Sequence, residues 1–367
     1  MQKYLLAHWR SELGLLKSSL LNGAALMRQM LRGVFHVAIV MIAVHFLVPE
    51  AMADIRVMQD RQITGVFIYH DKQHGYVLGT ASDHGLNIPL FVNQKFNKDG
   101  WISQGDALPV LPVWAQKGQT WRPQMIRLTD AATGKDRFLL YFSARTPSEN
   151  GTHCIGVATS GNALGPYQSP GQTPLICVHG REAIDPAPFL DDDGTLYLSW
   201  KLGGRMREYQ PTINLNRLTA DGLQIAGPAT VLITNDAPWE GMNVEAPFLM
   251  KRHGTYYLFY SGNLFQTPRY GIGYATSSKV TGPYVKSTAN PLVVSNETFG
   301  FGPGEELVFS DSCGNEWLGF SDYDQRDAVG PPHQRHFHAV HLLASQNSAG
   351  AARGVSLDAR SDFAICP

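Results

Sequence analysis

The chain has 367 residues, with 30 Lys and Arg against 31 Asp and Glu, so its formal charge at pH 7 is −1. This balance gives no reason to expect nucleic acid or an anionic membrane surface as a partner, and a neutral ligand fits better. Aromatic residues make up 10% of the chain beside 36 Gly and 22 Pro, which predicts many short strands joined by tight turns.

The first predicted element is a leader. An apolar run at residues 34–48 follows two arginines and precedes Ala51-Met52-Ala53, which is the order of a secretory signal. This run is shorter than the roughly 20 residues that a membrane span needs. We therefore predict cleavage after Ala53, with residues 1–53 as leader and residues 54–367 as a secreted or periplasmic chain.

Two alternatives to this leader remain open. The apolar run could stay uncleaved as a membrane anchor, and only then would the membrane be a partner. Residues 1–26 make the leader unusually long, and a start at Met27 or Met30 would give a signal of more ordinary length.

Four cysteines lie in the part predicted to be exported, and an even number in an oxidising compartment permits two bridges. Proximity along the chain favours Cys154 with Cys177, and Cys313 with Cys366, which would hold the C-terminus. Three pairings are possible, and buried unpaired thiols are an alternative. No CxxC or HExxH spacing occurs, so a zinc site has little support.

The chain then repeats itself with a period of about 60 residues. The runs that begin at Phe138 and at Gly156 return 117 to 118 residues later, and each copy ends on Gly-Pro-Tyr. A second repeat has half that period, because Ile184–Leu190 returns as Val244–Leu249. Residues 54–367 have room for five such units.

Each unit is a set of short strands: an apolar run, a Gly or Asp turn, an aromatic-rich run and a further strand. Four-stranded units repeated around a channel make a β-propeller, which leaves only short, protected sheet edges. A β-sandwich followed by a second domain is the main rival, but it does not explain a sustained 60-residue period. We therefore predict an all-β, five-bladed β-propeller over residues 54–367.

Asp185 and Glu245 occupy matched positions in this repeat, 60 residues apart. The residue that opens the innermost strand of each blade points into the channel, so matched positions converge on one site. Glycoside hydrolysis needs two such carboxylates, one to protonate the leaving oxygen and one to activate water or tune its partner. Two carboxyl groups that lie close together also raise each other's pKa, which keeps a general acid protonated near neutral pH. The alternative is structural: Asp185 caps a turn before Pro186, and Glu245 is a buried, paired residue.

Four motifs in chain order, within roughly residues 60–325, resemble glycoside hydrolase family 43. Ile184-Asp185-Pro186 is similar to the segment whose Asp orients and tunes the acid, and Glu245-Ala246-Pro247 to the segment with the general acid. Trp121-Arg122-Pro123 resembles a Trp-Ala-Pro segment, and Gly302-Pro303-Gly304 the start of a Gly-Pro-Gly-His element. The resemblance implies an inverting glycosidase that acts on arabinose- or xylose-containing oligo- or polysaccharides and requires no cofactor.

The third carboxylate departs from the family's pattern. Family members usually carry the base in an Asp-Pro near the mature N-terminus, and residues 59–68 contain none. The expected position falls near Ile63 or Thr64, and the closest carboxylate is Asp60, which we predict as the base if a short insertion brings it into the channel. Asp71 fits the following turn better, and Asp83 the next strand.

A second departure is Glu305, which stands where the family carries a His. Glu305 could bind a structural Ca²⁺ in the central channel, because hard cations accept carboxylate oxygens. Glu305 or Glu306 could instead supply part of the catalytic machinery, or Glu305 could be a solvated loop residue. A histidine cluster nearby lacks a partnering Cys or Glu spacing, so it gives a metal site little support; it consists of His333, His336, His338 and His341.

Three tryptophans are candidate substrate-binding residues, because aromatic faces stack on sugar rings: Trp121, Trp200 and Trp239. Core packing is the alternative for Trp200. These features predict an exported glycosidase with Glu245 as general acid and Asp185 as pKa modulator. A catalytically impaired carbohydrate-binding propeller is the main alternative, since the Asp-Pro and the channel His are both missing. A propeller that mediates protein contacts would show no acidic pocket.

Overall fold

The computed structural model describes residues 55–58, 61–96, 99–130, 132–147, 151–203, 209–346, 352–358 and 366. The predicted leader and Asp60 lie outside these residues. All of the described residues belong to the unit Ala53–Pro367. Within them, no helix is both long enough and apolar enough to cross a membrane.

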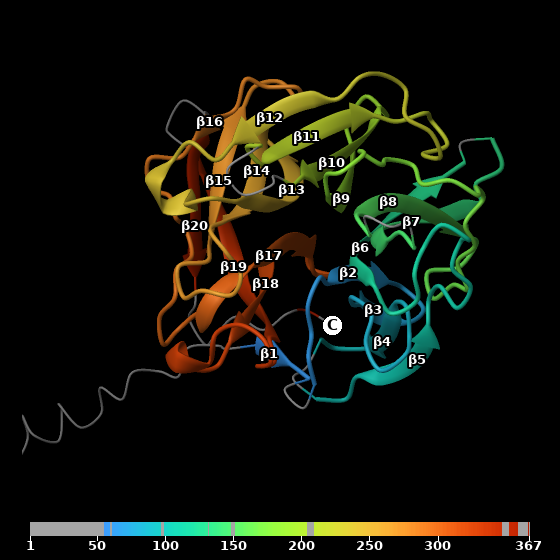
Figure 1. The fold of residues 1–367 in the computed structure, drawn as a ribbon, viewed down its shortest axis with the longest axis horizontal. Coiled ribbons are helices and arrows are strands. Elements are labelled where there is room, and N and C mark those ends of the chain that lie inside the picture. The colour runs from blue at the N-terminus through green and yellow to red at the C-terminus, as the bar shows by residue number, and fades with distance from the viewer. Residues whose placement is uncertain are drawn as a thin grey trace, which may run out of the picture. The chain divides into compact units, whose positions relative to one another are not determined.

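The described residues form five antiparallel sheets, which Figure 1 shows arranged as blades around a common centre. The first blade comprises β2 (Phe67–Asp71), β3 (Gly75–Gly79), β4 (Pro89–Asn93) and β5 (Ile102–Asp106). The second comprises β6 (Thr120–Thr129), β7 (Asp136–Arg145) and β8 (His153–Ser160). The third comprises β9 (Ala183–Leu190), β10 (Leu196–Leu202), β11 (Thr212–Arg217) and β12 (Thr230–Thr234).

The fourth blade comprises β13 (Val244–Arg252), β14 (Thr255–Gly262), β15 (Gly271–Ser277) and β16 (Val285–Lys286). The fifth comprises β17 (Phe301–Ser310), β18 (Glu316–Tyr323), β19 (His336–Gln346) and β20 (Ala352–Asp358). The N-terminal strand β1 (Ile55–Val57) pairs antiparallel with β19 and so completes this last blade. Two short 3₁₀ helices, Pro238–Glu240 and Arg326–Ala328, lie between strands.

The blades close into a ring. The innermost strands contact one another in the order β2, β6, β9, β13, β17 and back to β2. Each pair of neighbouring blades shares one apolar cluster, so the core is divided among the five interfaces. The predicted all-β, five-bladed propeller is therefore confirmed. Representative buried pairs across the interfaces are Val77 and Phe142, Leu139 and Leu198, Leu215 and Leu258, Phe259 and Phe320, and Phe337 and Leu78.

One residue in or just before each innermost strand has a positive φ, 57 to 63 residues after its counterpart in the preceding blade. In β6, β9, β13 and β17 the pairing register shifts at this point, which marks a β-bulge. Bulges re-aim side chains and recur next to active sites. We call these positions the inner-strand bulge residues: Gly65, Arg122, Asp185, Ala246 and Glu305.

The structure contains the two predicted disulfides, Cys154–Cys177 and Cys313–Cys366. The second joins the turn between β17 and β18 to residue 366. This pairing agrees with proximity along the chain, since each bridge joins the nearest cysteines in sequence.

Candidate active site

Asp185 is the inner-strand bulge residue of the third blade, and its carboxylate faces the fourth. Its backbone N–H donates to Ser143 Oγ at 3.0 Å, and its Oδ2 accepts from the Ala246 N–H at 3.0 Å. Burial raises the pKa of Asp185 to about 6, against the opposing charge of Arg122 and with a further rise from Glu245. A carboxyl with a raised pKa can hold a proton near neutrality.

Glu245 lies on β13, one residue before the bulge residue Ala246, so its match with Asp185 in the repeat is offset by one position. Lys201 Nζ lies 2.7 Å from Glu245 Oε2, and the Tyr270 hydroxyl donates to Oε1 at 2.7 Å. Burial by itself would raise the pKa of Glu245, but the Lys201 charge and hydrogen bonds outweigh burial and lower it. In this pair Asp185 is therefore the carboxyl that favours the proton.

Arg122 is the bulge residue of the second blade and is almost completely buried. Its guanidinium donates to the backbone oxygens of Glu306, at 2.5 Å, and Pro247, at 3.4 Å. Arg122 thus ties the second blade to the fourth and fifth beside Asp185. Glu306 is fully buried, and burial raises its pKa to about 8, so this side chain is a neutral acid at pH 7.

Glu305 is the bulge residue of the fifth blade and reaches toward the first. Its Oε2 accepts from the Gly65 N–H at 3.1 Å and forms an ion pair of 3.0 Å with Arg335 Nη1. The Glu305 backbone N–H donates to Ser261 Oγ at 2.9 Å. The arrangement repeats that of Asp185, because each carboxylate accepts the N–H of the next blade's bulge residue.

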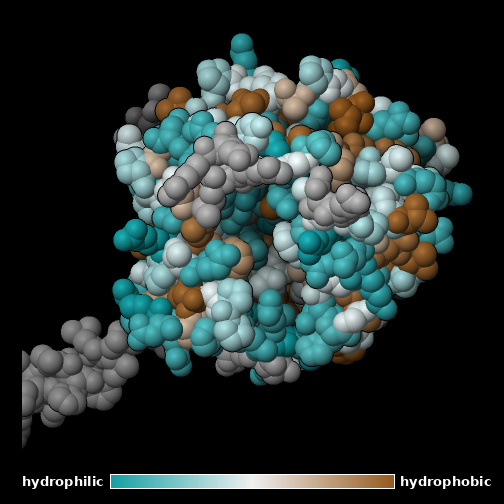
Figure 2. Space-filling view, viewed as in Figure 1, coloured by the Kyte–Doolittle hydropathy of each residue, from teal (hydrophilic) through white to brown (hydrophobic). Residues whose placement is uncertain are grey.

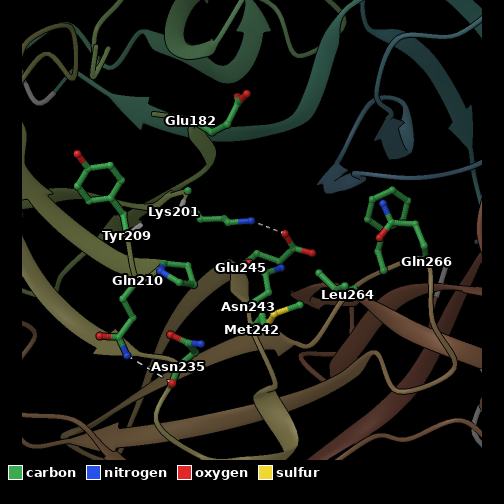
Figure 3. Close-up of a pocket in the computed structure, with 13 residues that line it drawn as sticks. Glu182, Lys201, Tyr209, Gln210, Asn235, Met242, Asn243, Glu245, Leu264 and Gln266 are labelled. Carbon is green, nitrogen blue, oxygen red and sulfur yellow. Dashed lines mark hydrogen bonds and ion pairs between the residues drawn. The ribbon is translucent and has the colours of Figure 1, made fainter. Parts of the chain in front are cut away.

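Two cavities meet at Glu245. One has a volume of about 370 Å³ and is lined by Asp185, Glu305 and Trp121 among others. The other has a volume of about 600 Å³ and is lined mainly by polar side chains, among them Lys201 (Figure 3). Glu245 lines both cavities. Hydrophilic residues also surround the hollow near the middle of the face in Figure 2.

The predicted substrate-binding tryptophans separate into two groups. Trp121 lines the smaller cavity and is 40% exposed, with His153 stacked on its ring at 3.6 Å between centroids. Trp200 is 4% exposed and donates to Asn216 Oδ1, while Trp239 packs on Tyr260 in an apolar cluster. Neither is among the residues that line these two cavities. Trp200 is a core residue, which corrects its prediction as a sugar-binding residue, whereas Trp239 is partly buried and stays a prediction.

The metal candidates are engaged by protein groups. Glu305 faces the Arg335 guanidinium, and His336 and His338 pair with Asp324 and Asp322. Among the described residues, the one group of three ligand-type side chains close enough for an ion is Asp311, Cys313 and Cys366, in which the two cysteines are bonded to each other. A calcium ion at Glu305 stays a prediction.

Sequence reasoning missed Lys201, although the repeat contains a signal for it. The second strands of the second, fourth and fifth blades carry Ser143, Ser261 and Ser321 close to the bulge of the innermost strand, and the third blade carries Lys201 there. An alignment of the repeats would therefore have pointed to Lys201, because a lysine stands where three other blades carry a serine. Tyr270 and Arg335 lie outside the matched positions, and no repeat signal points to them.

Known proteins resemble this chain in sequence and in fold. A family model described as "Glycosyl hydrolases family 43" matches residues 62–342. Beta-D-galactofuranosidase xynD of Aspergillus niger is 31% identical over 204 residues, 54% of this chain and 54% of that protein. Arabinoxylan arabinofuranohydrolase of Bacillus subtilis is 32% identical over 238 residues, 56% of this chain and 43% of that protein.

The chain spans about half the length of these two relatives. A solved structure, described as that of a thermostable family-43 glycoside hydrolase, superposes with a TM-score of 0.70 at 23% identity. The superposition covers 83% of this chain and 95% of that one, so it extends over most of the propeller.

Proposed function

The chain belongs to family 43 of the glycosyl hydrolases, and from this premise we propose that it hydrolyses O-glycosidic bonds in arabinose- or xylose-containing glycans with inversion. Glu245 acts as general acid, and Asp185 tunes it. The observation that carries the proposal is that both carboxylates line one cavity, where Asp185 accepts the N–H of the residue after Glu245. Two carboxyl groups in one pocket are what this hydrolysis requires.

The position of Glu245 between two cavities supports its role as the acid. A general acid protonates the oxygen that joins two sugar units, so one unit must lie on each side of it. The smaller cavity, with Asp185 and Trp121, receives the sugar whose anomeric carbon reacts. The larger cavity receives the leaving part of the glycan, and its polar lining includes Tyr209 and Gln210.

In this mechanism, substrate binding raises the pKa of Glu245 so that it becomes protonated. Without substrate, Lys201 holds Glu245 ionised and the raised pKa of Asp185 favours the proton there. A leaving group in the larger cavity offers oxygens to Lys201 Nζ, which also lines that cavity. Glu245 then loses the ion pair that lowers its pKa and takes up the proton.

The named activities of the relatives support a pentose or furanose substrate. One is named a galactofuranosidase and the other an arabinoxylan arabinofuranohydrolase. We also propose that the chain is exported, because its two disulfides suit an oxidising compartment.

The test is sugar release by the purified chain from 4-nitrophenyl α-L-arabinofuranoside, β-D-xyloside and β-D-galactofuranoside, and from linear arabinan. We expect Glu245→Gln to lower kcat/KM by about 100-fold or more on the glycan that is cleaved, because a sugar leaving group needs a proton, and by less on a nitrophenyl glycoside, whose leaving group is a weak base. The matched control is Glu297→Gln, the same chemical change at an exposed residue that lines neither cavity. Full activity in Glu245→Gln would contradict the proposal, and oligosaccharide binding without turnover would favour the carbohydrate-binding alternative.

A further inference from the structure

The structure shows where a first-blade carboxylate would have to lie. Gly65 is the bulge residue of the first blade and therefore the counterpart of Asp185. A Cβ atom on Gly65 would lie 2.9 Å from both N and Cα of Arg122, closer than real Cβ contacts. The first blade thus has no room for a side chain at this position.

A carboxylate from another blade lies against this position instead. Glu305 extends from the fifth blade until its Oε2 accepts the Gly65 N–H at 3.1 Å. Its side chain is 26% exposed and lines the same cavity as Asp185 and Glu245. We propose that Glu305 is the general base of the hydrolysis, which replaces a first-blade aspartate; this assignment rests on the proposed glycosidase function.

The contacts of Glu305 suit a base. Its hydrogen bond to Gly65 and its ion pair with Arg335 both engage Oε2, which leaves Oε1 available to a water in the cavity that Glu305 lines. Arg335, which supplies the ion pair, is itself buried and held by the Ser321 backbone oxygen at 2.7 Å. The Glu305 backbone is fixed as well, through Ser261 Oγ. A positioned and charged carboxylate of this kind can orient a water and accept its proton.

The step balances without a co-reactant. The water oxygen forms a bond to the anomeric carbon while its proton passes to Glu305 Oε1. The bond between the anomeric carbon and the leaving oxygen breaks, and the leaving oxygen takes the proton of Glu245. Attack from the face opposite the leaving group inverts the anomeric configuration. Proton exchange with solvent then restores Glu245 and Glu305.

Glu306 is excluded from this role by its surroundings. It is fully buried, lines neither cavity and accepts a hydrogen bond from Ser261 Oγ at 2.5 Å. Its raised pKa also keeps it protonated at neutral pH, when a base must be ionised. Asp60 lies outside the described residues, so it enters the experiment as the competing base.

The experiment compares Glu305→Gln, Glu305→Ala and Asp60→Asn on the most rapidly cleaved nitrophenyl glycoside. We expect Glu305→Gln to lower kcat by about 10²- to 10⁴-fold with KM changed only a few-fold, and Asp60→Asn to stay within about twofold of the wild type. Sodium azide should restore Glu305→Ala by about tenfold or more, because this anion attacks without a base. The product should then be a glycosyl azide of inverted configuration, which a merely structural role of Glu305 would not yield.

Several results would overturn the assignment. These are near-normal kcat in a folded Glu305→Gln, azide rescue of Asp60→Asn in place of Glu305→Ala, or wild-type activity that EDTA abolishes and Ca²⁺ restores. If Glu305→Gln does not fold, Glu305→Asp serves instead, because it keeps a negative charge beside Arg335 but moves the carboxylate back from the cavity. Normal kcat in Glu305→Asp would also count against Glu305 as the base. Absence of wild-type turnover would instead overturn the proposed function, and the Glu305 assignment with it.

Discussion

At the scale of single residues, the site depends on side chains that alternate along one strand. Trp200 and Lys201 are consecutive on β10, yet Trp200 enters the apolar cluster between the second and third blades while Lys201 reaches Glu245. Burial lowers the pKa of Lys201, but the charges of Glu245 and Asp185 outweigh burial and raise it. Lys201 therefore stays charged, and in the proposed mechanism it controls the protonation of Glu245.

We expect Lys201→Met to move the basic limb of the kcat/KM profile to higher pH by about one unit. Lys201 stabilises ionised Glu245, so its removal raises the pKa of Glu245 and keeps the acid protonated to higher pH. The measurement is initial rate from pH 4 to 9. Lys251→Met is the matched control, since Lys251 pairs with Asp191 away from both cavities. An unchanged basic limb, or one shifted toward acid, would refute this role for Lys201.

At the scale of elements, the second strand of one blade supports the innermost strand of the next. Ser143 on β7 accepts the Asp185 N–H, and Ser261 on β14 accepts the Glu305 N–H. Where the fifth blade meets the first, Ser321 on β18 instead donates to the Ile63 carbonyl. These serines connect neighbouring blades beside the inner-strand bulges, and Ser143 and Ser261 thereby fix the backbones of Asp185 and Glu305.

We expect Ser143→Ala to lower the free energy of unfolding by about 1–3 kcal/mol, because the buried Asp185 N–H loses its acceptor. Urea unfolding followed by tryptophan fluorescence measures this change. Ser160→Ala, at the end of β8 where the hydroxyl accepts an exposed N–H, should change stability by no more than about 0.5 kcal/mol. Equal effects of the two substitutions would show that the Ser143 hydrogen bond contributes no more to stability than the exposed Ser160 hydrogen bond.

At the scale of the whole propeller, stability depends on how the first and fifth blades are joined. The β1 strand pairs with β19, and the Cys313–Cys366 disulfide holds residue 366 beside the fifth blade. The backbone oxygen of Cys366 also accepts a hydrogen bond from Tyr76 of the first blade. The N-terminal strand and a C-terminal residue thus both act where the ring closes.

We expect loss of the Cys313–Cys366 bridge, by paired Cys→Ser substitution, to lower the free energy of unfolding by about 4 kcal/mol. Loss of Cys154–Cys177 should cost about 0.7 kcal/mol less, because a separation of 23 residues restricts the unfolded chain less than one of 53. Urea unfolding of both variants against the wild type measures the difference. A larger cost for Cys154–Cys177 would contradict the chain-entropy explanation.

The sequence by itself predicted the five blades and the shared cavity of Asp185 and Glu245, and proximity along the chain favoured the two disulfides that the structure contains. Repeated segments must fold alike, so a 60-residue period implies equivalent blades, and matched residues in a radial repeat converge on its axis. Trp121, which was predicted because aromatic faces stack on sugar rings, also lines the smaller cavity. These features depend on local patterns that each blade carries within itself.

Only the tertiary structure decided which other side chains face the cavities and which charges meet there. Trp200 enters the core because strand register and packing, which residue type does not reveal, set the direction of its side chain. The contact of Glu305 with Gly65 joins residues 240 positions apart. This contact exists because closure of the ring brings the last blade against the first. No local sequence pattern predicts a contact between residues so far apart in the chain.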